Sequence, residues 1–159
     1  MNAPSLTAAE WFELLQLVTE VAAAGDEHDA DRYVSHFFES AIVDHHDAGP
    51  LDDYWGANAK LDRVEGRGAI REHRGRIPRL PVRSHVVSNF RVLEVGDGWY
   101  RTEFIATVVT PDRDHPTVLR MSTVVDRIER DNDSRPRIAE RHIHFHATGA
   151  LAHHELIDR

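Results

Sequence analysis

The sequence predicts an α+β fold in which helices come first and a curved, mostly antiparallel sheet follows. Three observations predict it. Apolar residues recur at helical spacing in the N-terminal part, apolar and polar residues alternate in the C-terminal part, and short turns rich in Gly, Asp and Pro separate the alternating runs. Helices followed by consecutive strands are typical of α+β proteins. The 159 residues are expected to form a single domain over 1–159.

Three helices are expected before the long strands. The first begins at a capping box, Thr7-Ala8-Ala9-Glu10, and continues through apolar residues at helical spacing until Gly25 ends it. Asp26 is then placed to cap a second helix, roughly 27–38. A third, shorter helix is expected at about 69–77.

The strands are expected to include one short strand and four long ones. The short strand, 41–43, runs into Asp44-His45-His46-Asp47, and residues 48–65 are expected to form a long loop. The long strands are expected at about 83–95, 98–110, 117–130 and 136–146. Gly96-Asp97-Gly98 predicts a tight hairpin turn between the first two of them.

Composition excludes several classes of function. The net charge of -8 argues against a nucleic-acid partner, because phosphate binding needs a basic surface. No apolar run approaches the ~20 residues that cross a membrane, and the N-terminus lacks the pattern of a secretion signal, so a cytoplasmic location is expected. The chain has no cysteine, which excludes disulfides, thiolate metal ligands and cysteine nucleophiles. It also lacks a glycine-rich nucleotide loop, so no organic cofactor is expected.

The strand that begins near residue 83 carries the most informative side chain. Alternation puts His85, Val87 and Asn89 on one face of this strand. A histidine titrates near neutral pH and is therefore suited to general acid–base catalysis. The alternatives are a histidine hydrogen-bonded within the core, or a binding contact without catalysis.

Four segments together resemble the nuclear transport factor 2-like, or SnoaL-like, superfamily. They are the helix and strand from Asp26 to Asp44, the helix start Glu65-Gly66-Arg67-Gly68-Ala69-Ile70, the segment Ser84-His85-Val86-Val87-Ser88-Asn89, and the strand Arg137-Ile138-Ala139-Glu140-Arg141. The resemblance implies a cone-shaped, cystatin-like barrel of three N-terminal helices packed on a curved sheet.

Within that superfamily the pocket resembles scytalone dehydratase and related dehydratases. Those enzymes pair an aspartate at the second helix with a histidine on the first long strand, and the matching residues are Asp26 and His85. The resemblance implies that Asp26 orients the imidazole of His85 while the ring moves a proton. Gly25 and His45 stand where scytalone dehydratase has tyrosines. The alternative role for Asp26 is a simple helix cap, worth about 1 kcal/mol.

Several other side chains are candidates for substrate binding. His45 and Asn89 would contact substrate oxygens, although alternation allows only one of His45 and His46 to face the pocket. Tyr54 and Trp55 in the long loop would form an aromatic lid, or else anchor the loop to the core. Glu103 and Arg120 are a possible pair across neighbouring strands in the pocket; the alternative is surface ion pairs.

His142, His144 and His146 alternate along the last strand. Three imidazoles on one face suit Zn²⁺ or another transition metal. We favour the alternative, in which Ile143 and Phe145 pack inward and these histidines line the outer face of the sheet or a subunit interface.

These observations favour a cofactor-independent lyase or isomerase, of the dehydratase kind, that acts on a hydrophobic, oxygenated small molecule. The alternative is a non-catalytic domain of the same fold that binds a small ligand or assembles with partners. A homodimer or homotrimer is expected, because an open sheet with an exposed face tends to associate.

Overall fold

The computed structural model describes residues 5–46, 63–77, 84–111 and 116–146. The elements in chain order are α1 (Ala8–Asp26), α2 (Ala30–Ser35), β1 (Phe37–His46), β2 (Val64–Glu65), α4 (Arg67–Arg76), β3 (Ser84–Val95), β4 (Trp99–Pro111), β5 (Pro116–Arg130) and β6 (Pro136–Phe145). This order confirms the predicted α+β class.

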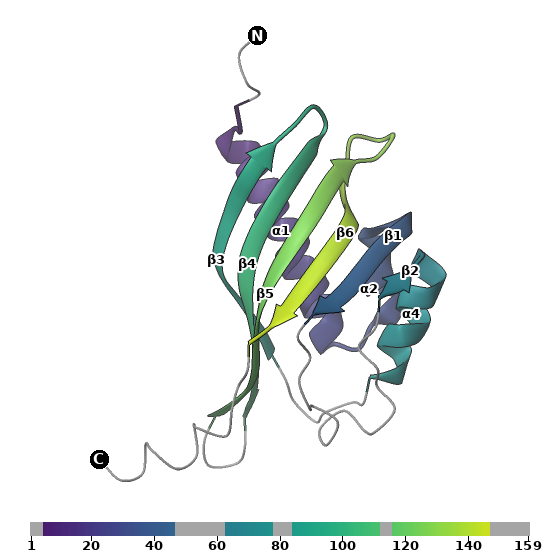
Figure 1. The fold of residues 1–159 in the computed structure, drawn as a ribbon, viewed down its shortest axis with the longest axis vertical. Coiled ribbons are helices and arrows are strands. Elements are labelled where there is room, and N and C mark those ends of the chain that lie inside the picture. Colours follow the sequence, from purple (N-terminus) through teal and green to yellow (C-terminus); the bar gives the residue numbers. More distant parts are fainter. Residues whose placement is uncertain (1–4, 47–62, 78–83, 112–115, 147–159) are drawn as a thin grey trace, which may run out of the picture.

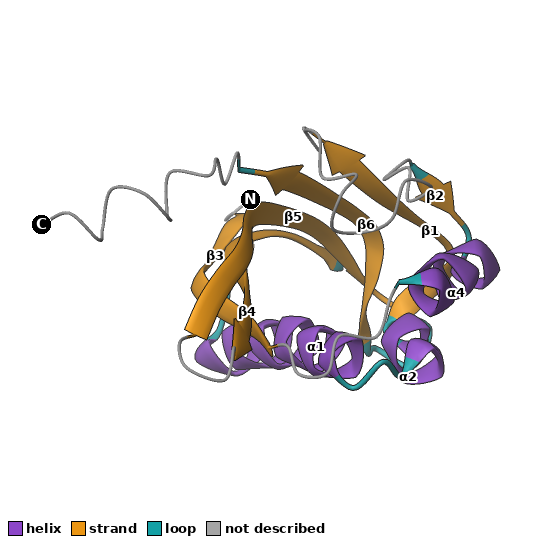
Figure 2. Ribbon diagram, turned by 90° about the horizontal axis from the view of Figure 1, so that it is seen from below, coloured by secondary structure: helices purple, strands orange, loops and turns teal. Residues whose placement is uncertain are grey.

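The strands form one six-stranded sheet in the order β2-β1-β6-β5-β4-β3. All neighbours are antiparallel except β1 and β6, which run parallel. The sheet curves over α1, while α2 and α4 lie beside β1 (Figures 1 and 2). We call the face toward the helices the inner face and the opposite one the outer face. On β4 the inner positions Tyr100, Thr102, Phe104, Ala106 and Val108 are all buried.

The long strands and the hairpin turn lie where they were predicted, to within one residue at each end. In the turn, Gly96 N–H donates to the Trp99 carbonyl at 2.8 Å, and Gly98 has a φ of 73°, which glycine adopts without steric cost. No helix in the described ranges is long and apolar enough to cross a membrane.

The predicted second helix was wrong in its extent. The left-handed backbone of His28, with a φ of 56°, separates the two helices, and Asp29 rather than Asp26 caps α2 by accepting the Arg32 N–H at 2.9 Å. The helix ends at Ser35 and β1 begins at Phe37, so β1 is longer than the predicted 41–43. β2 lies within the stretch predicted to be a loop.

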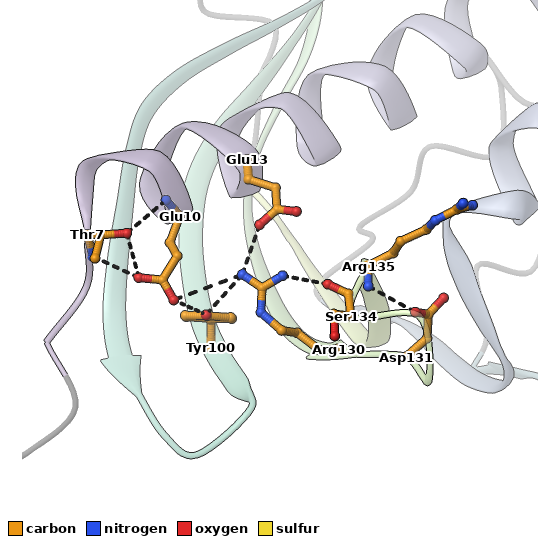
Figure 3. Close-up of polar contacts among 8 residues, drawn as sticks. All are labelled: Thr7, Glu10, Glu13, Tyr100, Arg130, Asp131, Ser134 and Arg135. Atoms are coloured by element: carbon orange, nitrogen blue, oxygen red, sulfur yellow. Dashed lines mark hydrogen bonds and ion pairs between the residues drawn. The ribbon is translucent and has the colours of Figure 1, made fainter.

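The N-terminal end of α1 is fixed to the sheet by a polar cluster (Figure 3). The predicted capping box is present, since Glu10 N–H donates to the Thr7 hydroxyl and the Glu10 carboxylate accepts the Thr7 N–H at 2.9 Å. The other carboxylate oxygen of Glu10 accepts the Tyr100 hydroxyl of β4 at 2.8 Å. Arg130 of β5 donates to Glu13 at 2.8 Å. These contacts help to set the position of α1 and therefore of Asp26 at its far end.

The Glu10 carboxyl makes this cluster sensitive to acid. Hydrogen bonds from the Thr7 hydroxyl and N–H, and then from Tyr100, lower the pKa of Glu10 to about 2. A lowered pKa stabilises the folded state above the ordinary carboxyl pKa of 4.5, and this contribution is lost as the pH falls toward about 2. We expect Glu10→Gln to flatten the decline of thermal stability between these two pH values. Tyr100→Phe, which removes one donor, should flatten it less. Superimposable curves for the wild type and Glu10→Gln would contradict this assignment.

Candidate active site

Asp26 and His85 are far apart in the chain and are joined by two hydrogen bonds. The Asp26 Oδ2 atom accepts the backbone N–H of His85 at 2.8 Å, and Oδ1 lies 2.5 Å from the ring Nδ1. Both side chains are 21% exposed, so they are shielded but within reach of small molecules. A carboxylate accepts hydrogen bonds, so this contact places the ring proton on Nδ1 and a lone pair on Nε2.

The fold brings this pair together at the end of α1. Asp26 is the last residue of α1, and His85 is the second residue of β3. α1 packs along β3, and the rings of Trp11 and Phe90 meet edge to face with centroids 5.5 Å apart. Because Asp26 holds both the backbone and the ring of His85, the imidazole orientation is set by two contacts.

The surroundings of His85 on the inner face are apolar. His85 pairs with Val108 of the neighbouring strand β4, and Val87 pairs with Ala106 of the same strand. Val108 and Ala106 are 6% and 9% exposed. An apolar wall beside an acid–base group suits a hydrophobic substrate and strengthens electrostatic interactions at the reacting atoms.

Arg74 of α4 is a cation near Asp26. The sequence alone did not indicate it as a site residue. Its guanidinium lies over the Tyr33 ring, 4.5 Å from the centroid. Burial lowers the pKa of Arg74, while Tyr33 and the nearby Asp26 carboxylate act in the opposite direction. A Cβ on Gly25 would clash with Arg74 Nη2, so the absence of a side chain at Gly25 makes room for the guanidinium.

A second ion pair lies deeper on the inner face. Arg141 of β6 donates two hydrogen bonds to Asp126 of β5, Nε to Oδ1 at 2.8 Å and Nη2 to Oδ2 at 2.7 Å. The Asp126 side chain is 0% exposed and that of Arg141 is 7% exposed. Burial alone would lower the pKa of Arg141, but the Asp126 carboxylate and Tyr33 together outweigh burial and raise this pKa. Sequence reasoning missed this pair, although a carboxylate between Val124 and Ile128 on one strand face was a usable signal.

His45 lies on the inner side of β1, where it alternates with the buried Ala41 and Val43. Its ring lies 5.5 Å from that of His73 on α4 and 6.0 Å from that of Phe145, between centroids. Burial, followed by the charges of Arg74 and Arg76, lowers the pKa of His73. His73 Nε2 is buried without a hydrogen-bond partner among the described residues. These two imidazoles therefore add to the polar groups of the inner face.

The predicted position of Asn89 beside His85 was wrong. Two residues of β3, Asn89 and Phe90, face the single residue Phe104 of β4 between the pairs Ser88–Ile105 and Arg91–Glu103, and Asn89 takes a left-handed φ of 54°. This β-bulge shifts the alternation. Asn89 is exposed, and Phe90 packs inward in its place.

The predicted pairing of Glu103 with Arg120 was also wrong. Glu103 lies on the outer face and accepts a 2.9 Å hydrogen bond from Arg91 of β3. In the register of β4 with β5, Glu103 faces Val125. The backbone of Arg120 on β5 pairs with Val108 on β4, and Val108 pairs with His85 on β3, so the three residues form one row across the sheet. The Arg120 side chain lies outside the described part of the structure, as do Tyr54 and Trp55.

The histidines of β6 lie on the outer face, as the favoured interpretation expected. Arg141, Ile143 and Phe145 occupy the inner positions, since Ile143 packs against the core and Phe145 stacks on the inward-facing His45. His142 and His144 face Asp44 and His46 of β1 across the parallel register. His146 instead contacts the Thr123 hydroxyl at 2.8 Å.

Comparison with known proteins places this chain in a family. The family model described as a SnoaL-like domain matches residues 8–142. The chain belongs to the SnoaL-like domain family. This SnoaL-like domain contains the inner face, Asp26, His85 and most of β6. A search of curated proteins found no match.

Solved structures confirm the nuclear transport factor 2-like, cystatin-like fold of the SnoaL-like domain. A Nostoc punctiforme protein of unknown function, with a cystatin-like fold, has a TM-score of 0.72 at 17% identity, over 93% of this chain and 99% of that one. A Catenulispora acidiphila protein in complex with S-DNPA has a TM-score of 0.68 at 23% identity, over 87% and 95%. Aln2 from a Streptomyces species has a TM-score of 0.69 at 21% identity, over 89% and 93%.

Proposed function

We propose that this protein is a small-molecule lyase or isomerase, of the dehydratase kind, in which His85 and Asp26 transfer a proton. The observation that supports this is the double contact from Asp26 to the backbone and ring of one histidine, at 2.8 and 2.5 Å. A histidine bound only as a core residue needs no carboxylate fixing its tautomer. The same arrangement is what a general base requires.

In the proposed reaction, His85 Nε2 removes a proton from a substrate carbon next to a carbonyl group. The Asp26 carboxylate stabilises the imidazolium that forms, since it accepts the hydrogen bond from Nδ1–H. The electron pair from the broken C–H bond moves onto the carbonyl oxygen to give an enolate. In a dehydratase-type reaction, the enolate re-forms the carbonyl and pushes its electron pair into a new double bond to the neighbouring carbon, the C–O bond on that carbon breaks, and the imidazolium gives its proton to the departing hydroxyl group, which leaves as water. In an isomerase, the proton returns to a different carbon.

The developing negative charge needs a positive partner, and we infer that Arg74 supplies it. Its charge lies near Asp26 and the Tyr33 ring, and an arginine stays protonated throughout the ordinary pH range.

His45, with His73 beside it, would contact a second oxygen of the substrate. Arg120 remains a candidate because its backbone lies in the His85 row. We therefore infer a substrate with a hydrophobic body and at least two oxygens. One related structure is a complex with S-DNPA, which is compatible with a small-molecule ligand.

Hydrogen–deuterium exchange tests this proposal without knowledge of the full reaction. Hydrophobic ketones and hydroxyketones would first be selected by the rise in melting temperature that they cause. The selected compounds would then be incubated in D₂O with wild-type protein, and deuterium gain at carbon would be followed by NMR. We expect exchange with the wild type and a rate about 10²–10⁴-fold lower with Asp26→Asn, because an amide N–H next to Nδ1 moves the ring proton to Nε2 and removes the base.

Asp26→Asn keeps the size of the side chain, so far-UV circular dichroism should match the wild type. Compounds that bind but exchange at equal rates with wild type, variant and buffer would refute the catalytic proposal. That result would favour the alternative of a non-catalytic ligand-binding domain.

A further inference from the structure

A cluster of metal-binding side chains lies on the outer face, across the parallel strands β1 and β6. Asp44 and His46 lie two residues apart on β1, and His142 of β6 is the register partner of Asp44. One ligand atom from each of these three residues lies within 4.8 Å of the others. We propose that Asp44, His46 and His142 form a binding site for a divalent ion of the Zn²⁺ type.

The distances fit such an ion. His46 Nε2 lies 3.1 Å from His142 Nδ1 and 3.7 Å from Asp44 Oδ2. Zinc bonds to nitrogen and carboxylate oxygen are about 2.0–2.2 Å long, which sets tetrahedral ligands roughly 3.2–3.6 Å apart. These two separations lie close to this range, and the third, between Asp44 and His142, is within 4.8 Å, so side-chain rotations would bring the three atoms around one ion.

The donor set is also suited to zinc. Two imidazole nitrogens and one carboxylate oxygen are ligands that Zn²⁺ accepts, and three protein ligands leave one position for water. The Asp44 side chain is 19% exposed, and those of His46 and His142 are 35% and 33% exposed. An ion from solution can therefore reach the cluster, and the carboxylate offsets part of its charge.

The neighbours of the cluster support the tautomer that a metal needs. The 3.1 Å contact between two ring nitrogens requires one proton between them, and a bound ion would replace it. The Glu140 carboxylate lies 3.6 Å from His142 Nε2, where it favours the proton on that nitrogen and leaves Nδ1 to the metal. Arg63 Nη1 lies 3.9 Å from Asp44 Oδ2. The short hydrogen bond of Arg63 goes instead from Nε to Glu65 Oε1, at 2.7 Å.

The His144 ring plays a different part from the three ligands. It stacks on the His46 ring with centroids 4.5 Å apart and an angle of 10° between the planes. In this face-to-face arrangement it supports His46 without directing a nitrogen to the same point. The proposed site thus differs from the set His142, His144 and His146 that the sequence alone suggested, since it draws two ligands from β1. A bound ion would join the two parallel strands.

Zinc titration of the protein without a histidine tag, after removal of metal with a chelator, tests the proposal. We expect the wild type to bind one equivalent of Zn²⁺ by calorimetry. His46→Ala and His142→Ala should each weaken binding by at least about tenfold. His146→Ala is the matched control, and it should bind zinc as the wild type does. Asp44→Asn, which keeps the shape of the side chain, serves if an alanine variant does not fold.

Three results would overturn the proposal. One is a wild type that binds no zinc at micromolar concentrations. Another is equal binding by the wild type and His46→Ala, which would place the metal elsewhere in the chain. The third is a loss in His146→Ala as large as in His142→Ala, which would favour the three histidines of the last strand. Each outcome is independent of turnover at His85, because the metal ligands lie on the other face of the sheet.

Discussion

Replacing His85 with alanine is expected to lower the rate of proton transfer by about 10²–10⁴-fold, the usual contribution of a positioned acid–base group. The loss should appear in kcat, because in the proposed reaction the apolar inner face holds the substrate body and side chains other than His85 hold its oxygens. The exchange assay in D₂O, run at saturating ligand, measures this directly. Ligand affinity, followed by calorimetry, should change far less than the rate.

The control for this variant is His144→Ala, which removes an imidazole from the outer face. Its exchange rate should equal that of the wild type. If His85→Ala instead abolished binding while the wild type showed no turnover of any compound, His85 would be a binding residue and the protein a binding module. A loss of the far-UV circular dichroism signal would show that His85→Ala does not fold. In that case, His85→Gln would be used for the exchange and binding measurements.

Removal of the Asp126 carboxylate is expected to cause a large loss of stability. Asp126→Ala leaves the guanidinium of Arg141 buried between the rings of Phe37 and Phe104, whose centroids lie 5.6 and 5.7 Å away, without its paired anion. Breaking a buried ion pair in this way costs about 3–5 kcal/mol. Urea unfolding followed by circular dichroism gives the difference from the shift of the midpoint.

Two further variants separate the ion pair from the loss of packing. The double variant Asp126→Ala/Arg141→Met removes both charges, and it should be more stable than Asp126→Ala alone because no unpaired charge remains. Glu94→Ala breaks the exposed 3.0 Å pair with Arg101, and it should cost no more than about 1 kcal/mol. A cost for Asp126→Ala as small as that for Glu94→Ala would show that the buried charge is compensated in another way.

Local patterns predicted much of the fold because each depended on neighbouring residues. The capping box at Thr7, the alternation along the four long strands and the Gly96–Gly98 turn are of this kind. The Asp26–His85 contact came from resemblance, because it joins the end of a helix to the start of a distant strand. Helical spacing contains no information on which strand lies across from that end.

The errors in the candidate site have specific physical causes. Strict alternation assigned Asn89 to the inner face, but one extra residue at a bulge reverses the faces beyond it. Glu103 was predicted to pair with Arg120 of β5, but it pairs with Arg91 of β3. Alternation predicts the face on which a side chain lies, but it does not predict which residue of the neighbouring strand lies opposite. Arg74 was missed because its importance depends on burial, which arises only after α4 has packed, whereas the apolar neighbours of Asp126 on its strand face were a signal that was not used.

The parallel pairing of β1 with β6 has a consequence for how the protein folds. Ile42 lies opposite Glu140 in this pairing, so the β1 segment can pair with β6 only after the much later β6 segment has been made. Contacts between residues so far apart in the chain carry a large loop-closure entropy and slow the folding of a domain. During synthesis the edge of β1 that faces β6 remains unpaired until β6 leaves the ribosome, and this edge is a template for misassembly between nascent chains.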